Sequence, residues 1–243
     1  MTRAASLLSV LAAVAAVLCA PAPARADRRS FGWTYEYQTM PEGGLDLEIW
    51  ATQIRPAFGD PTNGYELMLE VEYGITDHWD LAFYQVFSQG PADTDALAFD
   101  KTKIETRYRF AERGEWPIDV LAYFEIVKPL REDAVELEWK AILARDVGPL
   151  TFALNLIAEL ELGDEVHFIP GWTFGATWEI VPAFHVGAET FGERNEDDTI
   201  HAWVGPALSW APSPKLWVTG AAGFGLTSNS EDFLARLVFG LSI

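Results

Sequence analysis

The chain has 243 residues, and its 36 Asp and Glu outnumber its 17 Lys and Arg, which gives a formal net charge of −19. Such an acidic chain lacks the basic footprint that binding of nucleic acid requires, and 13% aromatic residues argue against disorder. The one cysteine, Cys19, lies in the leader described next. Disulfides, thiol nucleophiles and thiolate-bound metals are thereby excluded from the mature chain, and we expect no cofactor.

Residues 1–26 are predicted to be a signal peptide. Arg3 supplies the initial positive charge, the apolar stretch that follows is too short to cross a bilayer, and Ala24-Arg25-Ala26 matches a cleavage signal. Cys19 raises the alternative of a lipoprotein, but Leu18 stands before it, where a lipid-attachment site has a small residue. We therefore expect export, and the loss of two arginines makes the mature chain more acidic by two charges.

Residues 27–43 form an N-terminal segment that precedes the regular pattern. Phe31 to Met40 could form a short strand, which Pro41-Glu42-Gly43-Gly44 then breaks. Where this segment lies depends on the number of strands that follow it.

Apolar and polar side chains alternate from residue 44 to residue 243, which is the period of a β-strand with two different faces. The hairpin 65–87 is the clearest unit, because its first arm sets Leu69 and Val71 against Glu70 and Glu72. Strands are predicted at about 45–54, in the two arms of hairpin 65–87, and at 98–110, 118–128, 134–145, 150–162, 166–180, 183–191, 199–210, 215–226 and 232–243.

The predicted strands number twelve, and tighter turns near residues 76, 112, 147, 182 and 213 alternate with longer polar loops. An even strand count with short turns on one side and long loops on the other is typical of outer-membrane barrels. The expected fold class is therefore all-β, a transmembrane antiparallel up-and-down β-barrel of about 12 strands over residues 44–243. A thirteenth strand from 31–40 would place the mature N-terminus outside, so we expect the segment 27–43 at or in the periplasmic mouth.

A soluble β-sandwich or a lipocalin-like periplasmic barrel is the alternative fold. It would need an opposing apolar layer for at least ten strands, whereas the other strand faces carry many Glu, Lys and Arg. Aromatic residues near the predicted strand ends favour the membrane barrel, because such residues form girdles at the two interfaces: Trp50, Tyr73, Trp79, Tyr108, Phe110, Trp116, Trp178, Phe184, Trp210 and Trp217.

Two stretches resemble known outer-membrane proteins. The stretch Leu69–Asp77, with Trp79-Asp80-Leu81 after it, resembles the E-x-E-Y-G-[LIV]-T-D hairpins of poorly characterised bacterial outer-membrane barrels, described as porin-like or as transporters and including those near the aromatic-degradation transporter group. The C-terminal strand 232–243 is similar to the barrel-assembly signal, although Ile243 replaces the usual terminal aromatic. The resemblance implies a fold and an outer-membrane location, and it names no substrate.

The polar strand faces would line the lumen, and their charged residues are the candidate site. They form two acidic walls and one mostly basic stripe: Asp46, Glu48, Glu66, Glu70, Glu72, Lys103, Glu105, Arg107, Arg109, Glu136, Glu138, Lys140, Glu159 and Glu161. Small residues on later strands would leave room opposite: Gly171, Gly175, Gly187, Gly205, Ala207, Gly223 and Gly225. One interpretation is an off-centre aqueous path whose charged walls set ion preference. The other is a lumen filled by salt bridges that closes the barrel.

The remaining residue types give little chemistry. The histidines His78, His167, His185 and His201 have no ligand-like spacing, so we expect no metal site. Some twelve-stranded outer-membrane barrels are lipid hydrolases with a Ser–His pair on the lipid-facing surface. Here the strand histidines face inward, and no serine follows one at the same-face spacing. We therefore expect no enzyme.

The outer loops carry acidic residues that could bridge to lipopolysaccharide through divalent cations or simply form a solvated rim: Asp93, Asp95, Glu132, Asp133, Asp164, Glu165, Glu196, Asp197, Asp198, Glu231 and Asp232. The function expected is a porin-like channel or transporter for small solutes in the outer membrane of a Gram-negative bacterium, with cation preference. Closed-lumen structural barrels and lipid-modifying enzymes are the alternatives. Expected partners are outer-membrane lipid, lipopolysaccharide, small solutes and the barrel-assembly machinery, through strand 232–243.

Overall fold

The computed structural model describes residues 28–59, 62–90, 96–195 and 198–243. The predicted signal peptide 1–26 lies outside these residues, as do Cys19 and the loop acids Asp93, Asp95, Glu196 and Asp197. Across the described ranges, no helix is long and apolar enough to cross a membrane.

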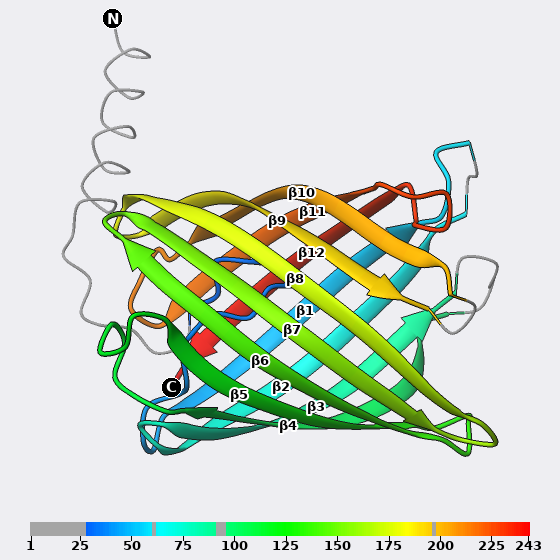
Figure 1. Ribbon diagram of the computed structural model, residues 1–243, viewed down its shortest axis with the longest axis horizontal. Helices are drawn as coiled ribbons and strands as arrows, with labels where there is room; N and C mark the ends of the chain where they lie inside the picture. The colour runs from blue at the N-terminus through cyan, green and yellow to red at the C-terminus, as the bar shows by residue number, and fades with distance from the viewer. Residues whose placement is uncertain (1–27, 60–61, 91–95, 196–197) are drawn as a thin grey trace, which may run out of the picture.

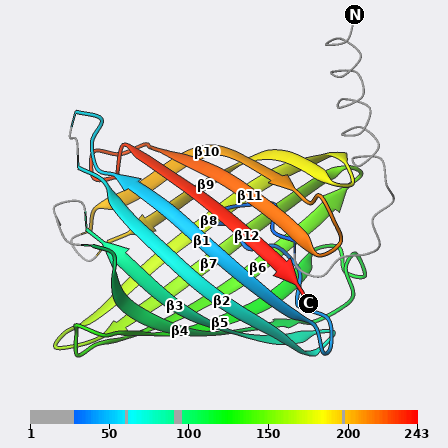
Figure 2. The same ribbon diagram turned by 180° about the vertical axis from the view of Figure 1, so that it is seen from behind.

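Twelve antiparallel strands form one closed barrel, in which neighbours in sequence pair and the last strand pairs with the first (Figure 1, and from behind in Figure 2). They are β1 (Leu45–Arg55), β2 (Gly64–Thr76), β3 (Trp79–Gln89), β4 (Ala98–Arg109), β5 (Asp119–Pro129), β6 (Val135–Val147), β7 (Leu150–Leu162), β8 (Val166–Val181), β9 (Phe184–Arg194), β10 (Ile200–Trp210), β11 (Leu216–Gly225) and β12 (Phe233–Ser242). This confirms the expected fold class, with strand boundaries within a few residues of the prediction.

Strand β1 closes the barrel by pairing with β12 from Asp46 opposite Ser242 to Arg55 opposite Phe233. Closure lets strand backbones bond one another, as a lipid environment demands. We call one end of the barrel the terminal end, because Ile243 N–H bonds to Leu45 O there and Arg28 Nη1 donates to Pro182 O. The turns β2–β3, β4–β5, β6–β7, β8–β9 and β10–β11 lie at this end. The opposite end, with the other connections, is the loop end.

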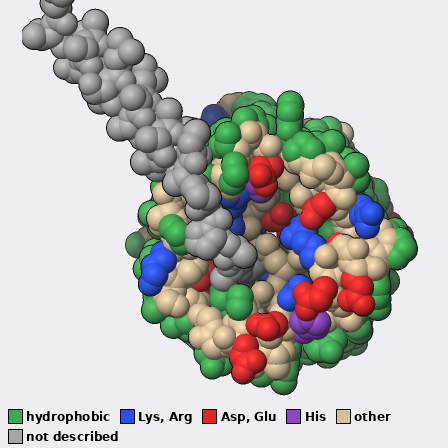
Figure 3. Space-filling view, turned by 90° about the vertical axis from the view of Figure 1, so that its left-hand side faces the viewer, with side chains coloured by type: hydrophobic (Ala, Val, Ile, Leu, Met, Phe, Trp, Pro, Cys, Tyr) green, Lys and Arg blue, Asp and Glu red, His purple; other side chains and the backbone are tan. Residues whose placement is uncertain are grey.

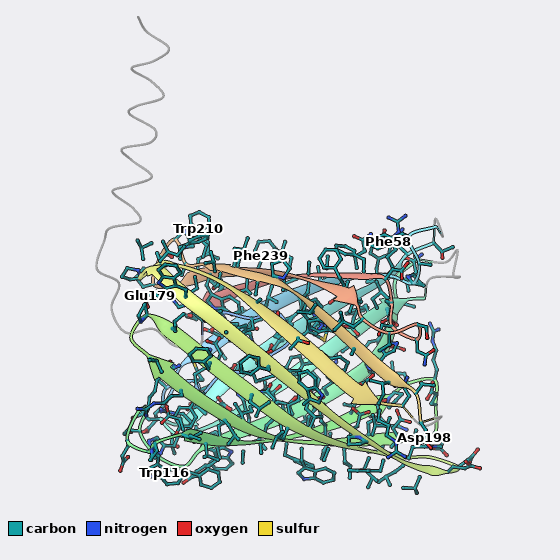
Figure 4. The ribbon with its side chains drawn as sticks, turned by 45° about the horizontal axis from the view of Figure 1, so that its top comes forward. Phe58, Trp116, Glu179, Asp198, Trp210 and Phe239 are labelled. Atoms are coloured by element: carbon teal, nitrogen blue, oxygen red, sulfur yellow. The ribbon has the colours of Figure 1, made fainter. Side chains whose placement is uncertain are left out.

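Large apolar side chains cover much of the outside of the wall. On β1 and β2, for example, Ile49 and Val71 are 48% and 44% exposed, while Glu48 and Glu72 between them are buried. Trp116, Trp210 and Phe239 project outward from the wall in Figure 4. Because side chains alternate across a strand, one face of each strand suits lipid and the other faces the lumen.

The prediction of an outer aromatic girdle is wrong for two of its residues. Trp50 and Trp217 are only 3% and 2% exposed, and they pack inside the barrel with Tyr84 and Val238. Trp50 shares the inward face of β1 with Glu48, so its parity, rather than its place near a strand end, decides its direction. Trp217 fits inward because Gly240, its partner on β12, has no side chain to displace the indole.

The N-terminal segment, residues 28–44, runs inside the barrel as irregular chain rather than as a strand (Figure 1). Phe31 is 1% exposed and packs against Ala153, Ala207 and Ala221. A Cβ atom added to Gly175 would lie 2.4 Å from the Phe31 ring. The wall of small residues on the later strands therefore accommodates this segment, whereas the sequence analysis left that space to the charged side chains.

Candidate functional site: the barrel lumen

All fourteen charged residues predicted to line the lumen lie on the inner face of the wall. Six of them are at most 2% exposed: Asp46, Glu48, Glu70, Glu72, Glu105 and Arg107. Seven line a cavity in the loop-end half of the barrel: Glu66, Lys103, Glu136, Glu138, Lys140, Glu159 and Glu161. The last, Arg109, donates from Nε to Thr39 Oγ1 of the N-terminal segment at 2.8 Å. In the end-on view of Figure 3, charged side chains gather around the mouth of the terminal end and apolar ones around its outside.

A buried ion-pair network occupies the terminal-end half of the lumen. Its centre is Arg107 on β4, whose guanidinium contacts Glu72 on β2, Asp80 on β3 at 2.8 Å and Glu105 at 3.3 Å. The hydroxyl of Tyr84 donates to Glu105 Oε2 at 2.6 Å. Asp80 was not among the predicted residues, although it shares the inward parity of Ala82 and Tyr84. A buried charge requires such partners, so this network fixes the three neighbouring strands β2, β3 and β4 to one another.

A second acidic group lies beside this network on β1 and β2. The register places Glu48 directly opposite Glu70, and Asp46 directly opposite Glu72. Trp50 Nε1 donates to Glu70 Oε2 at 2.9 Å. From the N-terminal segment, Arg29 approaches Glu48 at 3.5 Å, with its guanidinium 4.4 Å from the centre of the Trp50 ring.

The N-terminal segment is held to the wall by side chains of the later strands. Glu189 on β9 accepts hydrogen bonds from the backbone N–H groups of Gly32, Trp33 and Thr34, at 2.8, 3.0 and 2.9 Å. Asn155 on β7 both accepts from the N–H of Tyr35 and donates to its carbonyl. Backbone groups that would otherwise be buried without partners are thus satisfied, as a loop inside a barrel requires.

More of these anchors come from opposite sides of the barrel. Ser209 on β10 and Thr219 on β11 both donate to Arg29 O, and Arg236 on β12 donates to Gly32 O at 3.2 Å. At the other end of the segment, Asp80 accepts from the N–H of Met40 at 2.9 Å. The segment therefore crosses the lumen and contacts the wall on both sides. None of these contacts was predicted, because they join residues far apart in sequence.

The loop-end cavity has a volume of about 390 Å³, and Trp33 and Tyr35 of the N-terminal segment form part of its lining. Ten charged residues line it. Six are acidic (Glu66, Glu125, Glu136, Glu138, Glu159 and Glu161), and four are basic (Lys101, Lys103, Lys140 and Arg236). Glu125, Lys101 and Arg236 were missed by the sequence analysis, although the strand alternation places them on the inward face.

Glutamates face one another across the strands of this cavity. The register sets Glu105, Glu125, Glu138 and Glu159 opposite one another in a row across β4, β5, β6 and β7. Like charges directly opposite are destabilising, so cations are needed between them. Two lysines supply part of the positive charge that the row needs. Lys103 Nζ lies 3.1 Å from Glu125, and Lys140 Nζ lies 2.8 Å from Glu138.

Glu159 at the end of this row has a different environment. Within the described ranges, the charged groups that act most strongly on it are four carboxylates, those of Glu136, Glu138, Glu161 and Glu193. Its side chain is partly exposed to the cavity. This corner of the cavity therefore carries the negative potential that remains after the lysines have paired.

Aromatic rings in the cavity make cation–π contacts with basic side chains of the protein. Lys140 Nζ lies 4.1 Å from the ring centre of Tyr123 and 4.4 Å from that of Tyr35. The guanidinium of Arg236 lies 4.8 Å from the Trp33 ring. These contacts hold the basic side chains against the wall and the N-terminal segment, and they leave the carboxylates of Glu136 and Glu159 partly exposed to the cavity.

The structure brings one serine to a histidine, which the sequence gave no reason to expect. Ser30 Oγ lies 3.0 Å from His185 Nδ1, and His185 Nε2 lies 3.4 Å from Glu179 at the terminal end. Ser30 is 3% exposed and its own N–H bonds to Glu36 at 2.6 Å. Because Ser30 is buried, we interpret it as a residue that anchors the N-terminal segment. A nucleophile would have to be accessible to its substrate. Glu179 lies at the terminal end of the barrel in Figure 4.

Comparison with known proteins identifies relatives of the fold only. No family model and no curated protein sequence matches the chain. An outer membrane channel from Pseudomonas putida F1 has a similar structure, with 14% identity, a TM-score of 0.66, and coverage of 86% of this chain and 98% of that one. The NanC porin gives 12% identity, a TM-score of 0.56 and coverage of 82% and 98%. The KdgM porin, solved in complex with disordered oligogalacturonate, gives 10% identity, a TM-score of 0.56, and coverage of 82% of this chain and 97% of that one. The fold is therefore one that outer-membrane channels and porins share.

Proposed function

We propose that this protein is a porin-like channel of the outer membrane that passes small solutes and prefers cations. The observation that carries the proposal is the loop-end cavity of about 390 Å³ with six glutamates against four basic residues in its lining. Rings of acidic side chains attract cations and repel anions in narrow pores. The similarity to outer-membrane channels and porins supports a channel, and it leaves the solute open.

The outer surface supports the location in the membrane. A belt of exposed Leu, Ile, Val, Phe and Trp side chains surrounds the barrel, and it would contact outer-membrane lipid. In this orientation the loop end faces outward, next to lipopolysaccharide, and the terminal end faces the periplasm. Strand β12, which carries Leu237, Phe239 and Leu241 on its outer face, would engage the assembly machinery before it closes against β1.

A solute that enters the cavity next meets the N-terminal segment. Trp33 and Tyr35 line the cavity on that side, and the segment is bound to β7, β9, β10, β11 and β12. The segment occupies part of the lumen, so a channel past it would admit only small solutes and ions. This same observation favours the second candidate function, a structural barrel whose lumen stays closed.

Reversal potentials in planar bilayers under a salt gradient test the cation preference. We expect the sign that indicates cation selectivity for the natural chain. Glu159→Gln removes a carboxylate whose strongest charged neighbours are acidic, and it should shift the reversal potential toward zero. Glu112→Gln, in the turn at the terminal end and outside the cavity, is the matched control. Anion selectivity of the natural protein would refute the preference.

A further inference from the structure

The acidic group on β1 and β2 has the composition of a cation site. Glu48, Glu70 and Glu72 each offer one carboxylate oxygen, and these oxygens lie within 4.8 Å of one another. All three side chains are at most 2% exposed, so bulk water screens them little. The register accounts for their meeting, because Glu48 and Glu70 are cross-strand partners and Glu72 follows Glu70 on the same face of β2.

The second observation is the unused oxygen of Glu70. Trp50 Nε1 bonds to Glu70 Oε2 at 2.9 Å and fixes the direction of the carboxylate, while Oε1 is buried and accepts no hydrogen bond from the part of the chain that the structure describes. The nearby hydroxyl of Tyr84 has one proton, which it donates to Glu105. A buried carboxylate oxygen without a donor costs free energy unless a ligand occupies the position beside it.

The local charge balance points to a cation as that ligand. Among the described residues of β1 to β4, six carboxylates are buried: Asp46, Glu48, Glu70, Glu72, Asp80 and Glu105. The buried guanidinium groups described beside them are those of Arg29 and Arg107. Arg107 is shared among Glu72, Asp80 and Glu105, and Arg29 approaches Glu48. Acids therefore exceed bases here, and buried charges need compensation.

We propose that Glu48, Glu70 and Glu72 bind a calcium ion inside the barrel, beneath Arg29 of the N-terminal segment. Carboxylate oxygens are ligands for hard cations. Ca²⁺ holds oxygens at about 2.3–2.6 Å, so its ligands stand at most roughly 5 Å apart, and three oxygens that all lie within 4.8 Å of one another can surround it. Mg²⁺ usually keeps several waters and binds one or two carboxylates, whereas this buried group offers three carboxylates of the protein.

The ion would join β1 to β2, next to the closure of the barrel. The site is distinct from the loop-end cavity, since none of its three carboxylates lines that cavity. The proposal is therefore independent of the channel function. Sequence spacing could not reveal it, because the ligands come from two strands and include no histidine.

Terbium luminescence tests the site, because Tb³⁺ replaces Ca²⁺ and the Trp50 indole bonded to Glu70 can sensitise its emission. The full mature chain is refolded in detergent after removal of metal, with Tb³⁺ present during folding so that burial does not limit access. We expect a saturable signal that Ca²⁺ displaces at lower concentration than Mg²⁺ does. Trp50→Phe should weaken the signal, with Tyr84 and Trp217 left as nearby sensitisers, and keep Ca²⁺ binding in calorimetry.

Glu70→Gln keeps the shape of the side chain and removes its charge, so it should weaken Ca²⁺ binding roughly tenfold or more. Glu125→Gln, a lumen carboxylate of the cavity, is the matched control and should bind as the natural chain does. Folding of each variant is checked by heat-dependent migration in gels, and Glu48→Gln replaces Glu70→Gln if the latter does not fold. Absence of a saturable signal displaced by Ca²⁺, equal displacement by Mg²⁺, or unchanged binding by the Glu70 and Glu48 variants would overturn the proposal.

Discussion

The attachment of the N-terminal segment to Glu189 gives a prediction whose size follows from the structure. Glu189 accepts three backbone N–H groups, two of them at Oε2 and one at Oε1. Glu189→Gln keeps the shape of the side chain. In the more favourable of its two amide orientations, the oxygen still accepts from the N–H groups of Trp33 and Thr34, and the NH₂ group points at the N–H of Gly32. At least one buried donor then lacks an acceptor, which costs about 1–3 kcal/mol.

A cost of that size raises the population with this part of the segment undocked about 5- to 150-fold. Hydrogen exchange followed by mass spectrometry should show faster exchange of the amides of residues 32–34 by a comparable factor, while the strands stay protected. The matched control is Glu193→Gln, four residues further along the same face of β9, whose ion-pair partner is His201. Equal exchange of residues 32–34 in Glu189→Gln and the natural chain would refute this account of how the segment is held.

Contacts inside the lumen predict the stability of three further variants. Gly175→Ala brings a methyl group against the Phe31 ring and should lower the free energy of unfolding, measured in urea, by about 1–3 kcal/mol. Addition of Phe31→Leu should restore part of that loss, and full stability of Gly175→Ala alone would contradict the packing. Trp50→Phe leaves buried Glu70 without its donor and should cost a similar amount of stability, about 1–3 kcal/mol, in the same titration; no loss would show that this bond is not made. Tyr84→Phe removes the donor to Glu105 and should be milder, because Tyr35 still donates to the same oxygen at 3.0 Å; a loss as large as that of Trp50→Phe would argue against this shared role.

The wall of the barrel could be predicted from the sequence because its information is local. Alternation with a period of two assigns each side chain to lipid or lumen without knowledge of its neighbours, and the fourteen charged residues that it assigned inward lie on the inner face of the wall. The same alternation assigns Trp50 to the lumen. The prediction that Trp50 belongs to the aromatic girdle was wrong because it relied on the position of Trp50 near a strand end instead of on this alternation.

The contents of the lumen could not be predicted because they depend on contacts between distant residues. Glu189 lies 157 residues from Gly32, and no spacing or motif connects them. The glycines and alanines of the later strands did signal free volume, but their sequence does not say that Phe31 enters it. Strand register was equally hidden, so neither the glutamate row across β4–β7 nor the carboxylate group on β1 and β2 was foreseen.

The channel itself is tested most directly by current through the purified natural chain in a planar bilayer. The account predicts discrete conductance steps of small amplitude, because the N-terminal segment, whose Trp33 and Tyr35 line the cavity of Glu136, Glu138 and Glu159, occupies part of the lumen. Conductance no greater than that of protein-free lipid, from barrels shown to be folded by their heat-dependent migration, would contradict the channel and favour a closed structural barrel.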